Sequence, residues 1–203
     1  MLKNRLGIRD AGAHRTFEYG TTIARALTAP DFPMTADGYK AAHRHLFGAL
    51  YDWAGQARTI DLSKGETVFA RAAYIEASLQ ECFNNLAKAG FLRGMTPAAF
   101  AAATAHHISE INAIHPFREG NGRVMRLHLK QLAAQTGHRL DINDIAGPLW
   151  VQGSIAAFNG DEGPLAGLIE NAIGLNHRQA RAPIETPTAD TPGQPLCHRI
   201  PPA

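Results

Sequence analysis

The sequence predicts an all-α domain that carries one β-hairpin, and three observations support this fold class. Apolar residues recur at helical spacing along most of the chain, as in the run Tyr39, Ala42 and Leu46. Glycine and proline divide these runs into segments typical of short helices. The stretch 58–69 instead alternates apolar and polar residues, as a strand does.

Start and stop signals bound the predicted helices. Thr96-Pro97 is the strongest start signal, because it combines an N-cap hydroxyl with a proline at the first helical position. The predicted helices are one capped by Thr35, running through Trp53 and stopped by Gly55, one from Ile75 to Leu86 ended by Gly90, one from Thr96 to the stop at Pro116, one from near Asn121 to Gly137, and two shorter ones after Pro148 and after Pro164.

The hairpin is predicted within residues 57–70. Ile60 and Leu62 lie on one side of Lys64-Gly65 and Val68 on the other, and Gly65 supplies the positive φ of the turn. An isolated hairpin is marginal in water, so we expect it to pack on the helices or to project as a flap.

Composition describes an ordinary globular chain. Of 203 residues, 45% are hydrophobic and 19% charged, and the net charge of +2 contains no Lys/Arg run that would imply a nucleic-acid partner. Cys82 and Cys197 form no disulfide framework, which fits a reducing cytosol. The sequence has no run of eighteen apolar residues, so neither a membrane span nor a Sec signal is predicted. We expect one domain over 1–180, with the Pro- and Thr-rich residues 181–203 as a disordered tail or linker.

The segment 115–126 (HPFREGNGRVMR) gathers the residues that carry chemistry. A helix ends at Pro116, a glycine turn follows, and the N–H groups of the next helix form an anion site. The candidate phosphate ligands are Gly120, Asn121, Gly122, Arg123 and Arg126. Glu119 offers a carboxylate suited to Mg²⁺ shared with phosphates, and His115 is the candidate general base. These parts favour a nucleotide polyphosphate as ligand and phosphoryl-group transfer to a hydroxyl as reaction.

This segment resembles the signature of the Fic family, His-x-Phe-x-Asp/Glu-Gly-Asn-Gly-Arg-x-x-Arg, and matches it at every specified position. The upstream segment HRHLFGALYDWAGQARTIDLSKGETVFA is similar to the helix and flap that precede the signature in that family. The resemblance covers roughly residues 5–178 and implies a Fic-fold helical bundle with one hairpin flap.

The resemblance also implies a role for each site residue. His115 would deprotonate a target Ser, Thr or Tyr hydroxyl for attack on the α-phosphorus of ATP, while Phe117 would anchor the loop in the core. Glu119 would hold the Mg²⁺ that bridges the α- and β-phosphates. The anion hole and the arginines that grip the β- and γ-phosphates would be Gly120, Asn121, Gly122, Arg123 and Arg126. The flap around Lys64 and Gly65, which is a candidate for contact with nucleotide or target, would pair with the extended backbone of the target segment.

One position separates AMP transfer from phosphate transfer. Relatives that act as kinases carry Lys where this chain has Gly122, so the resemblance implies AMP transfer with release of pyrophosphate. Two alternatives stay open. The same fold can use another donor or group (UMP, GMP, phosphocholine or phosphate), or the chain can be a nucleotide-binding regulatory module with little turnover. An intact His115 and Glu119 argue against the second alternative.

Regulation is inferred from a missing motif. Many Fic enzymes carry Ser/Thr-x-x-x-Glu-Gly/Asn, whose glutamate pairs with the second signature arginine, here Arg126. The pairs Glu119-Gly120, Glu162-Gly163 and Glu170-Asn171 lack the hydroxyl residue, because His115, Phe158 and Ala166 occupy that position. The resemblance therefore implies a toxin whose inhibitory glutamate comes from a separate antitoxin, or the Fic module of a bacterial effector. Targets in that class include type II topoisomerases, and the expected location is the bacterial cytoplasm, with secretion into a host cell as the alternative.

Overall fold

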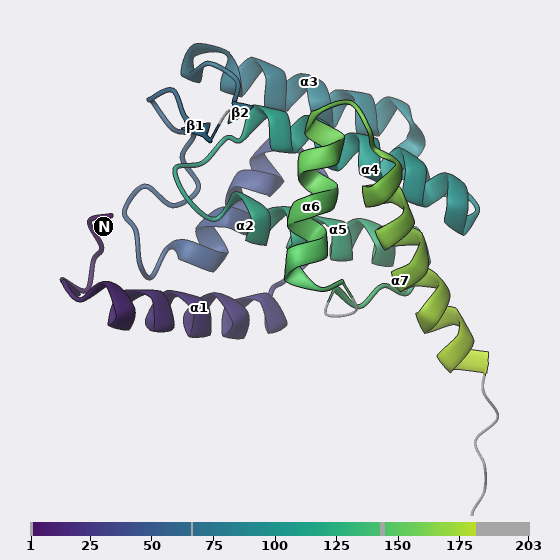
Figure 1. Cartoon of the computed structure of the whole chain (residues 1–203), viewed down its shortest axis with the longest axis horizontal. Helices are drawn as coiled ribbons and strands as arrows, with labels where there is room; N and C mark the ends of the chain where they lie inside the picture. Colours follow the sequence, from purple (N-terminus) through teal and green to yellow (C-terminus); the bar gives the residue numbers. More distant parts are fainter. Residues whose placement is uncertain (1, 66, 143–144, 182–203) are drawn as a thin grey trace, which may run out of the picture.

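The structure is a computed structural model in which residues 2–65, 67–142 and 145–181 are described, and helices make up most of it (Figure 1). The helices are α1 (Ala11–Leu27), α2 (Ala36–Phe47), α3 (Ile75–Lys88), α4 (Pro97–Ile114), α5 (Asn121–Gln135), α6 (Gly147–Phe158) and α7 (Gly163–Arg181), with 3-10 turns at Ala72–Tyr74 and Gly90–Leu92. The predicted class, all-α with one hairpin, is confirmed. Residues 182–203, which contain nearly all of the expected tail, lie outside the described residues.

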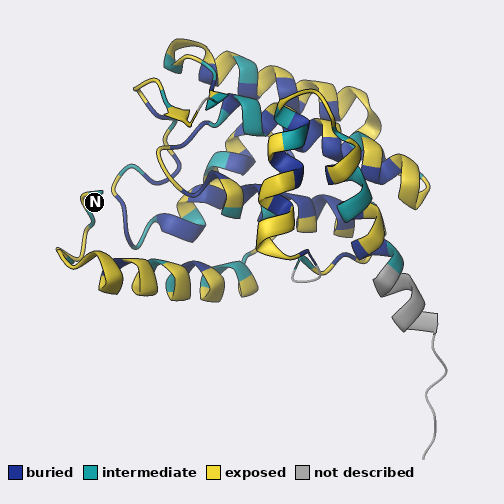
Figure 2. Cartoon of the chain, viewed as in Figure 1, coloured by how far each residue is buried: buried dark blue, intermediate teal, exposed yellow. Residues whose placement is uncertain are grey.

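Helix α4 is the central element of the bundle. It contacts α3, α5, α6 and α7, and the view coloured by burial shows the dark interior gathered around it (Figure 2). Phe100, Ile108 and Ile111 are almost fully buried, and the Thr96 hydroxyl caps the helix by accepting a hydrogen bond from the Ala99 N–H at 3.4 Å. The rigid centre of the fold therefore ends at residue 115, where the signature loop begins.

The hairpin consists of two very short antiparallel strands, β1 (Ser63–Lys64) and β2 (Thr67–Val68). Ser63 lies opposite Val68, and Gly65 has φ of +59°, as the predicted turn requires. The paired part is much shorter than the predicted range 57–70. The Phe69 N–H still donates across the hairpin to the Leu62 carbonyl at 3.2 Å, but the Arg58 and Ala70 N–H groups donate to the Pro116 and Ala113 carbonyls instead. We call residues 57–70 the flap.

Helix α2 ends earlier than the sequence predicts, at Phe47 with Gly48 as its C-cap. Leu50 and Trp53 therefore lie in the turns that follow. Gly55 does not stop the helix; it lets the chain double back against it, since a Cβ at Gly55 would lie 2.8 Å from the Lys40 carbonyl oxygen. Its φ of +82° also requires glycine.

Helix α1 is an element to which the sequence analysis assigns no structure. Most of its surface is exposed (Figure 2), and its buried side chains are the polar His14 and Thr22. Its apolar residues at helical spacing, Tyr19, Ile23 and Leu27, are exposed, so they do not mark a face that packs on the core. The Asp10 carboxylate begins it by accepting a hydrogen bond from the Ala13 N–H at 2.7 Å.

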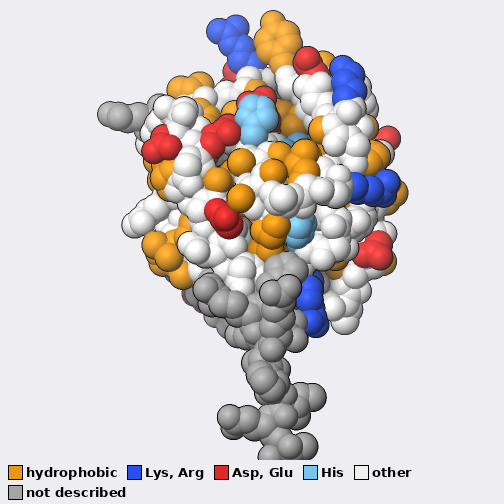
Figure 3. Space-filling view, turned by 90° about the vertical axis from the view of Figure 1, so that its right-hand side faces the viewer, with side chains coloured by type: hydrophobic (Ala, Val, Ile, Leu, Met, Phe, Trp, Pro, Cys, Tyr) orange, Lys and Arg blue, Asp and Glu red, His pale blue; other side chains and the backbone are white. Residues whose placement is uncertain are grey.

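The surface does not gather charge of one sign on the face seen in Figure 3, where acidic and basic side chains are scattered among hydrophobic ones. In the described ranges, no helix combines the length and the apolar character needed to cross a membrane.

Candidate active site

The signature loop joins the end of α4 to the start of α5 through two left-handed residues. His115 is the C-cap of α4 with φ of +47°, and Gly120 is the N-cap of α5 with φ of +83°. A Cβ on Gly120 would lie 2.3 Å from Cζ of Phe47, so only glycine fits there. The N–H groups of the first turn of α5 point out of the helix end, as an anion site requires.

Asn121 braces the loop from inside. Its Oδ1 accepts a hydrogen bond from the Phe117 N–H at 3.0 Å, and its Nδ2 donates to the Phe117 carbonyl at 2.7 Å. The amide that the sequence analysis proposes as a ligand donor is thus occupied within the loop. Phe117 itself is fully buried, as the family resemblance implies. The group of Asn121 that remains for a ligand is therefore its backbone N–H, at the start of α5.

His43 is a supporting residue that sequence reasoning missed. Its Nδ1 accepts a hydrogen bond from the Gly55 N–H at 2.9 Å, so Nε2 carries the hydrogen and donates to the Glu119 carbonyl at 2.9 Å. Its ring stacks on Phe117 with 3.8 Å between centroids. Burial lowers the pKa of His43 to about 4, which keeps the ring neutral. The available signal was a histidine on the apolar face of α2, in line with Tyr39.

His115 lies under the flap. Its ring stacks on Phe69, with 3.8 Å between ring centroids and 16° between ring planes. Together with Gly122 it lines a pocket of about 260 Å³ between the flap and α6. Burial lowers the pKa of His115 to about 4; the nearby Asn112 backbone opposes this shift, and the charges of Arg58 and Lys64 reinforce it. The imidazole is therefore neutral near pH 7, which is the form that a general base needs.

The two signature arginines leave α5 toward different neighbours. Arg123 donates from Nη2 to Glu18 Oε1 at 2.5 Å and from Nη1 to the Thr22 hydroxyl at 3.3 Å, and its guanidinium lies over the Phe47 ring. Arg126 donates to the carbonyl oxygens of residues 142 and 145 at 2.8 and 2.9 Å, beside Trp150. Both arginines also line a groove between α1 and α5. A phosphate would therefore have to draw each guanidinium at least partly from a partner that it already has.

Glu18 on α1 is the second residue that sequence reasoning missed. Its other carboxylate oxygen accepts a hydrogen bond from the Tyr51 hydroxyl, which also lies 3.2 Å from Nε2 of His14. Burial raises the pKa of Glu18, but the hydrogen bonds from Tyr51 and Arg123 outweigh it and lower that pKa below its usual value. Glu18 is therefore an ionised partner for Arg123. The available signal was the spacing of His14, Glu18 and Thr22, which places three polar residues on one face of a helix.

Glu119 is suited to a divalent cation. Its side chain is about half exposed, at 48%, and its Oε1 accepts hydrogen bonds from the Gly120 N–H at 2.9 Å and from Nη2 of Arg123 at 3.4 Å. Proteins commonly hold Mg²⁺ through one or two carboxylates while the substrate phosphates and water supply the remaining ligands. A single accessible carboxylate at the edge of an anion site fits that arrangement.

Lys64 and Gly65, the candidate flap residues, lie at different positions relative to this site. Lys64 lines the pocket that contains His115, and its charge acts on that imidazole. Gly65 is at the exposed turn, where a Cβ would meet no atom within 4 Å. The structure therefore brings Lys64 to the base and leaves Gly65 at the tip of the flap.

Comparison with known proteins identifies the family of this chain. Residues 33–133 match the Fic/DOC family. The chain is 39% identical over 175 residues to the probable protein adenylyltransferase y4lH of Sinorhizobium fredii, covering 85% of this chain and 91% of that one. It is 35% identical to the probable protein adenylyltransferase Fic of Salmonella typhimurium, covering 85% and 88%. BepC of Bartonella tribocorum, a VirB-translocated effector solved with bound AMPPNP, has a TM-score of 0.80 at 26% identity, covering 85% and 91%.

The class of enzyme that this fold and these relatives define is protein adenylyltransferase, as the sequence predicts. Within that class, the chain belongs to the Fic/DOC family.

Proposed function

We propose that the protein transfers AMP from ATP to a Ser, Thr or Tyr hydroxyl of a target protein and releases pyrophosphate. The observation that supports this most strongly is the juxtaposition of a neutral histidine, a glycine-rich helix start and the flap around one pocket. His115 and Gly122 both line that pocket, and Lys64 of the flap lines it as well. A base, a phosphate site and a docking element for the substrate thus meet in one place.

The reaction follows from these parts. Nε2 of His115 takes the proton of the target hydroxyl, whose oxygen forms a bond to the α-phosphorus. The bond between that phosphorus and the oxygen leading to the β-phosphorus breaks, and pyrophosphate leaves. The N–H groups of the first turn of α5 and the positive end of its dipole hold the phosphates. Arg123 and Arg126 add positive charge along the groove beside them.

Glu119 would hold Mg²⁺, which neutralises charge on the phosphates when bound. The nucleotide base would occupy the pocket beside His115, because its wall on α6 is mainly apolar: Trp150, Val151, Ile155 and Phe158. A pocket of about 260 Å³ at this point is large enough for one flat aromatic ring system.

Gly122 supports AMP transfer over the other sub-chemistries. A Cβ at that position would meet no atom within 4 Å, so the backbone leaves space directly in front of the anion site. A lysine there would fill this space with a cation and change how the phosphates are seated. The alternatives that use another donor, or that bind nucleotide with little turnover, are resolved by the experiment below.

The test uses ATP labelled at the α-phosphate in one reaction and at the γ-phosphate in another, with Mg²⁺ and bacterial lysate or a purified type II topoisomerase as target. We expect protein labelling from the α-labelled ATP alone. His115→Ala is expected to lower transfer by roughly 10²–10⁴-fold while leaving ATP binding intact. The matched control is His106→Ala, since His106 is an exposed histidine of α4 that pairs with Glu162 at the surface. Labelling from γ-labelled ATP alone, or full activity of His115→Ala, would refute the proposal.

We further propose that a small antitoxin binds the groove between α1 and α5. The outer side of α1 presents Tyr19, Ile23 and Leu27 at successive helical turns, with 64%, 43% and 72% exposure. These side chains line the groove together with both signature arginines. A partner helix with an apolar face and one glutamate matches this surface, because the glutamate would reach Arg126 while the apolar face covers the stripe.

The partner is tested with the protein encoded next to this chain in its genome. Ile23→Ser is expected to abolish inhibition by that protein, whereas Leu6→Ser, another exposed apolar residue, is expected to leave it unchanged. If the neighbouring protein neither binds nor inhibits the chain, the antitoxin proposal is wrong. We place the activity in the bacterial cytoplasm; the likeness to a translocated effector supports the alternative of delivery into a host cell.

A further inference from the structure

Arg58 is a buried arginine that donates to four backbone carbonyls. It is 2% exposed, and each acceptor is a neutral carbonyl oxygen rather than a carboxylate. The acceptors are Ile60 at 2.6 Å, Ala70, Ile114 at 3.3 Å and His115 at 2.9 Å. A guanidinium has five N–H donors in a planar fork, which suits it to hold several fixed acceptors at once.

These four carbonyls belong to two different functional elements. Ile60 and Ala70 are in the two arms of the flap, whereas Ile114 and His115 are at the end of α4, where the base is located. Two backbone hydrogen bonds reinforce the link: the Arg58 N–H donates to the Pro116 carbonyl at 2.8 Å, and the Ala70 N–H donates to the Ala113 carbonyl at 3.0 Å. Both arms of the flap are thus tied to the same stretch of chain as the base.

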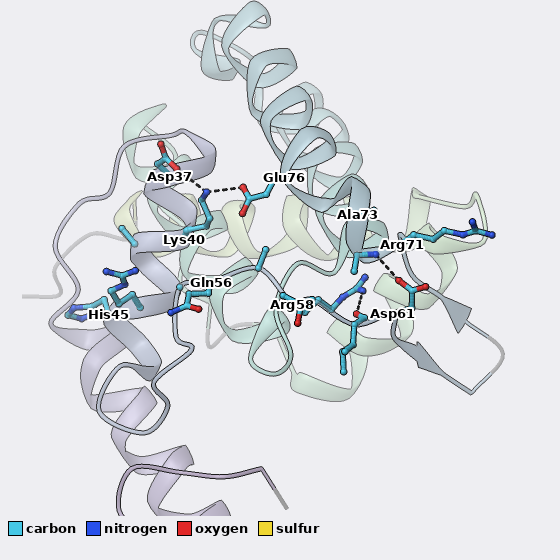
Figure 4. A pocket seen from close by; sticks show the side chains of 16 residues that line it. Asp37, Lys40, His45, Gln56, Arg58, Asp61, Arg71, Ala73 and Glu76 are labelled. Atoms are coloured by element: carbon cyan, nitrogen blue, oxygen red, sulfur yellow. Dashed lines mark hydrogen bonds and ion pairs between the residues drawn. The ribbon is translucent and has the colours of Figure 1, made fainter.

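The outer part of the flap is held much less. Its strands have two residues each, and Val68 is 71% exposed. Arg58 lies on the wall of a pocket of about 1460 Å³ and donates to the Ile60 carbonyl (Figure 4). The neighbouring Asp61 accepts a hydrogen bond from the Ala72 N–H at 2.7 Å. The flap therefore has an anchored root and an exposed tip.

We propose that Arg58 is a positioning residue that sets the distance between the flap and the catalytic histidine. This inference rests on the proposed function, in which the flap holds the target segment and His115 accepts the proton of its hydroxyl. If the root shifts, the hydroxyl and the base no longer meet in line with the α-phosphorus. A displacement of about 1 Å in such a constellation costs on the order of 10²-fold in rate.

The first test compares Arg58→Lys with Arg71→Lys. Lysine keeps the positive charge, but its single ammonium group cannot reach four spread acceptors. Arg71 is an exposed arginine at the end of the same segment and serves as the matched control. We expect Arg58→Lys to lower kcat for transfer to the target by roughly 10²-fold, with the Kd for ATP unchanged. Arg71→Lys is expected to match the wild type.

A merely structural role gives a different result. In that case Arg58→Lys lowers the melting temperature, but kcat per folded molecule, measured well below that temperature, stays at the wild-type value. This outcome would overturn the inference. A wild-type protein that transfers no AMP to any target would instead overturn the proposed function. The second measurement then tests whether Arg58 holds the root of the flap.

The second measurement uses the wild-type protein and serves also if Arg58→Lys does not fold. Amide hydrogen exchange is followed residue by residue across the flap. We expect the Arg58 and Ala70 amides to exchange slowly and at similar rates, because the same set of hydrogen bonds to the end of α4 protects both. Amides at the tip near Gly65 are expected to exchange much faster. If the Arg58 and Ala70 amides exchanged as fast as those at the tip, Arg58 would not hold the root of the flap.

Discussion

Two alanine substitutions in the signature loop, only two residues apart, are expected to act in opposite ways. Gly120 has φ of +83°, and a Cβ there would lie 2.3 Å from the ring of Phe47. Gly122 lies in the first turn of α5, where a Cβ would meet no atom within 4 Å. Gly120→Ala should therefore damage the fold, whereas Gly122→Ala should damage the function.

The expected magnitudes follow from this geometry. A left-handed backbone costs a residue other than glycine about 1–2 kcal/mol, and overpacking a core contact costs about 1–3 kcal/mol. We expect Gly120→Ala to lower the free energy of unfolding by their sum, about 2–5 kcal/mol. Gly122→Ala should change it by less than about 1 kcal/mol, and in the stabilising direction, since helices favour alanine over glycine. Its methyl group projects into the space proposed for the phosphates, so ATP binding should weaken.

Urea unfolding followed by circular dichroism measures the first quantity, and isothermal titration with ATP and Mg²⁺ measures the second. Equal free energies of unfolding for the two variants would refute the packing argument at Gly120. Unchanged ATP affinity in Gly122→Ala would show that the phosphates do not lie in front of α5.

The remaining predictions concern buried titratable and polar groups. Burial lowers the pKa of His43, His107 and His115 to about 4, against about 6.5 in the unfolded chain. Between these pH values the unfolded chain binds more protons than the folded chain. The free energy of unfolding is therefore highest above pH ~6.5 and declines as the pH falls toward ~4, and urea midpoints measured across that range will test this. The rate of AMP transfer should likewise hold down to about pH 5, because His115 stays neutral there. A rate that already falls with a midpoint near pH ~6.5 would contradict a buried His115. Tyr51→Phe removes a buried hydroxyl from Glu18 and should lower the free energy of unfolding by about 1–2 kcal/mol, whereas the exposed Tyr74→Phe should not change it.

Local chemistry was sufficient to predict most of the fold. The caps at Thr35 and Thr96 and the turn at Gly65 are properties of adjacent residues, and the structure confirms all three. Helix α1 was not predicted: its apolar residues at helical spacing are exposed, and the side chains that it buries, His14 and Thr22, are polar. The end of α2 was misplaced because Gly55 acts through a contact with Lys40, fifteen residues earlier in the sequence, which no local pattern reveals.

The candidate site likewise has a part that local sequence predicts and a part that only the folded chain reveals. His115 to Arg126 form one continuous segment, so their chemistry could be interpreted from spacing alone. The residues that support that segment come from elsewhere in the chain: Arg58 is 57 residues from His115, and Glu18 is 105 residues from Arg123. Their partners are backbone carbonyls or single side chains that only the folded structure brings near.

The stacking of His115 on Phe69 couples the support of the proposed base to the proposed docking of the target. Phe69 belongs to the flap, and its ring lies 3.8 Å from the imidazole, so the surface that supports the base is part of the element proposed to receive the target. If the flap receives the target as proposed, we expect variation in target choice to be confined to its tip. A new target preference can arise or be engineered at residues 63–68, but Phe69 must be kept, because replacing it would alter the base together with the docking site.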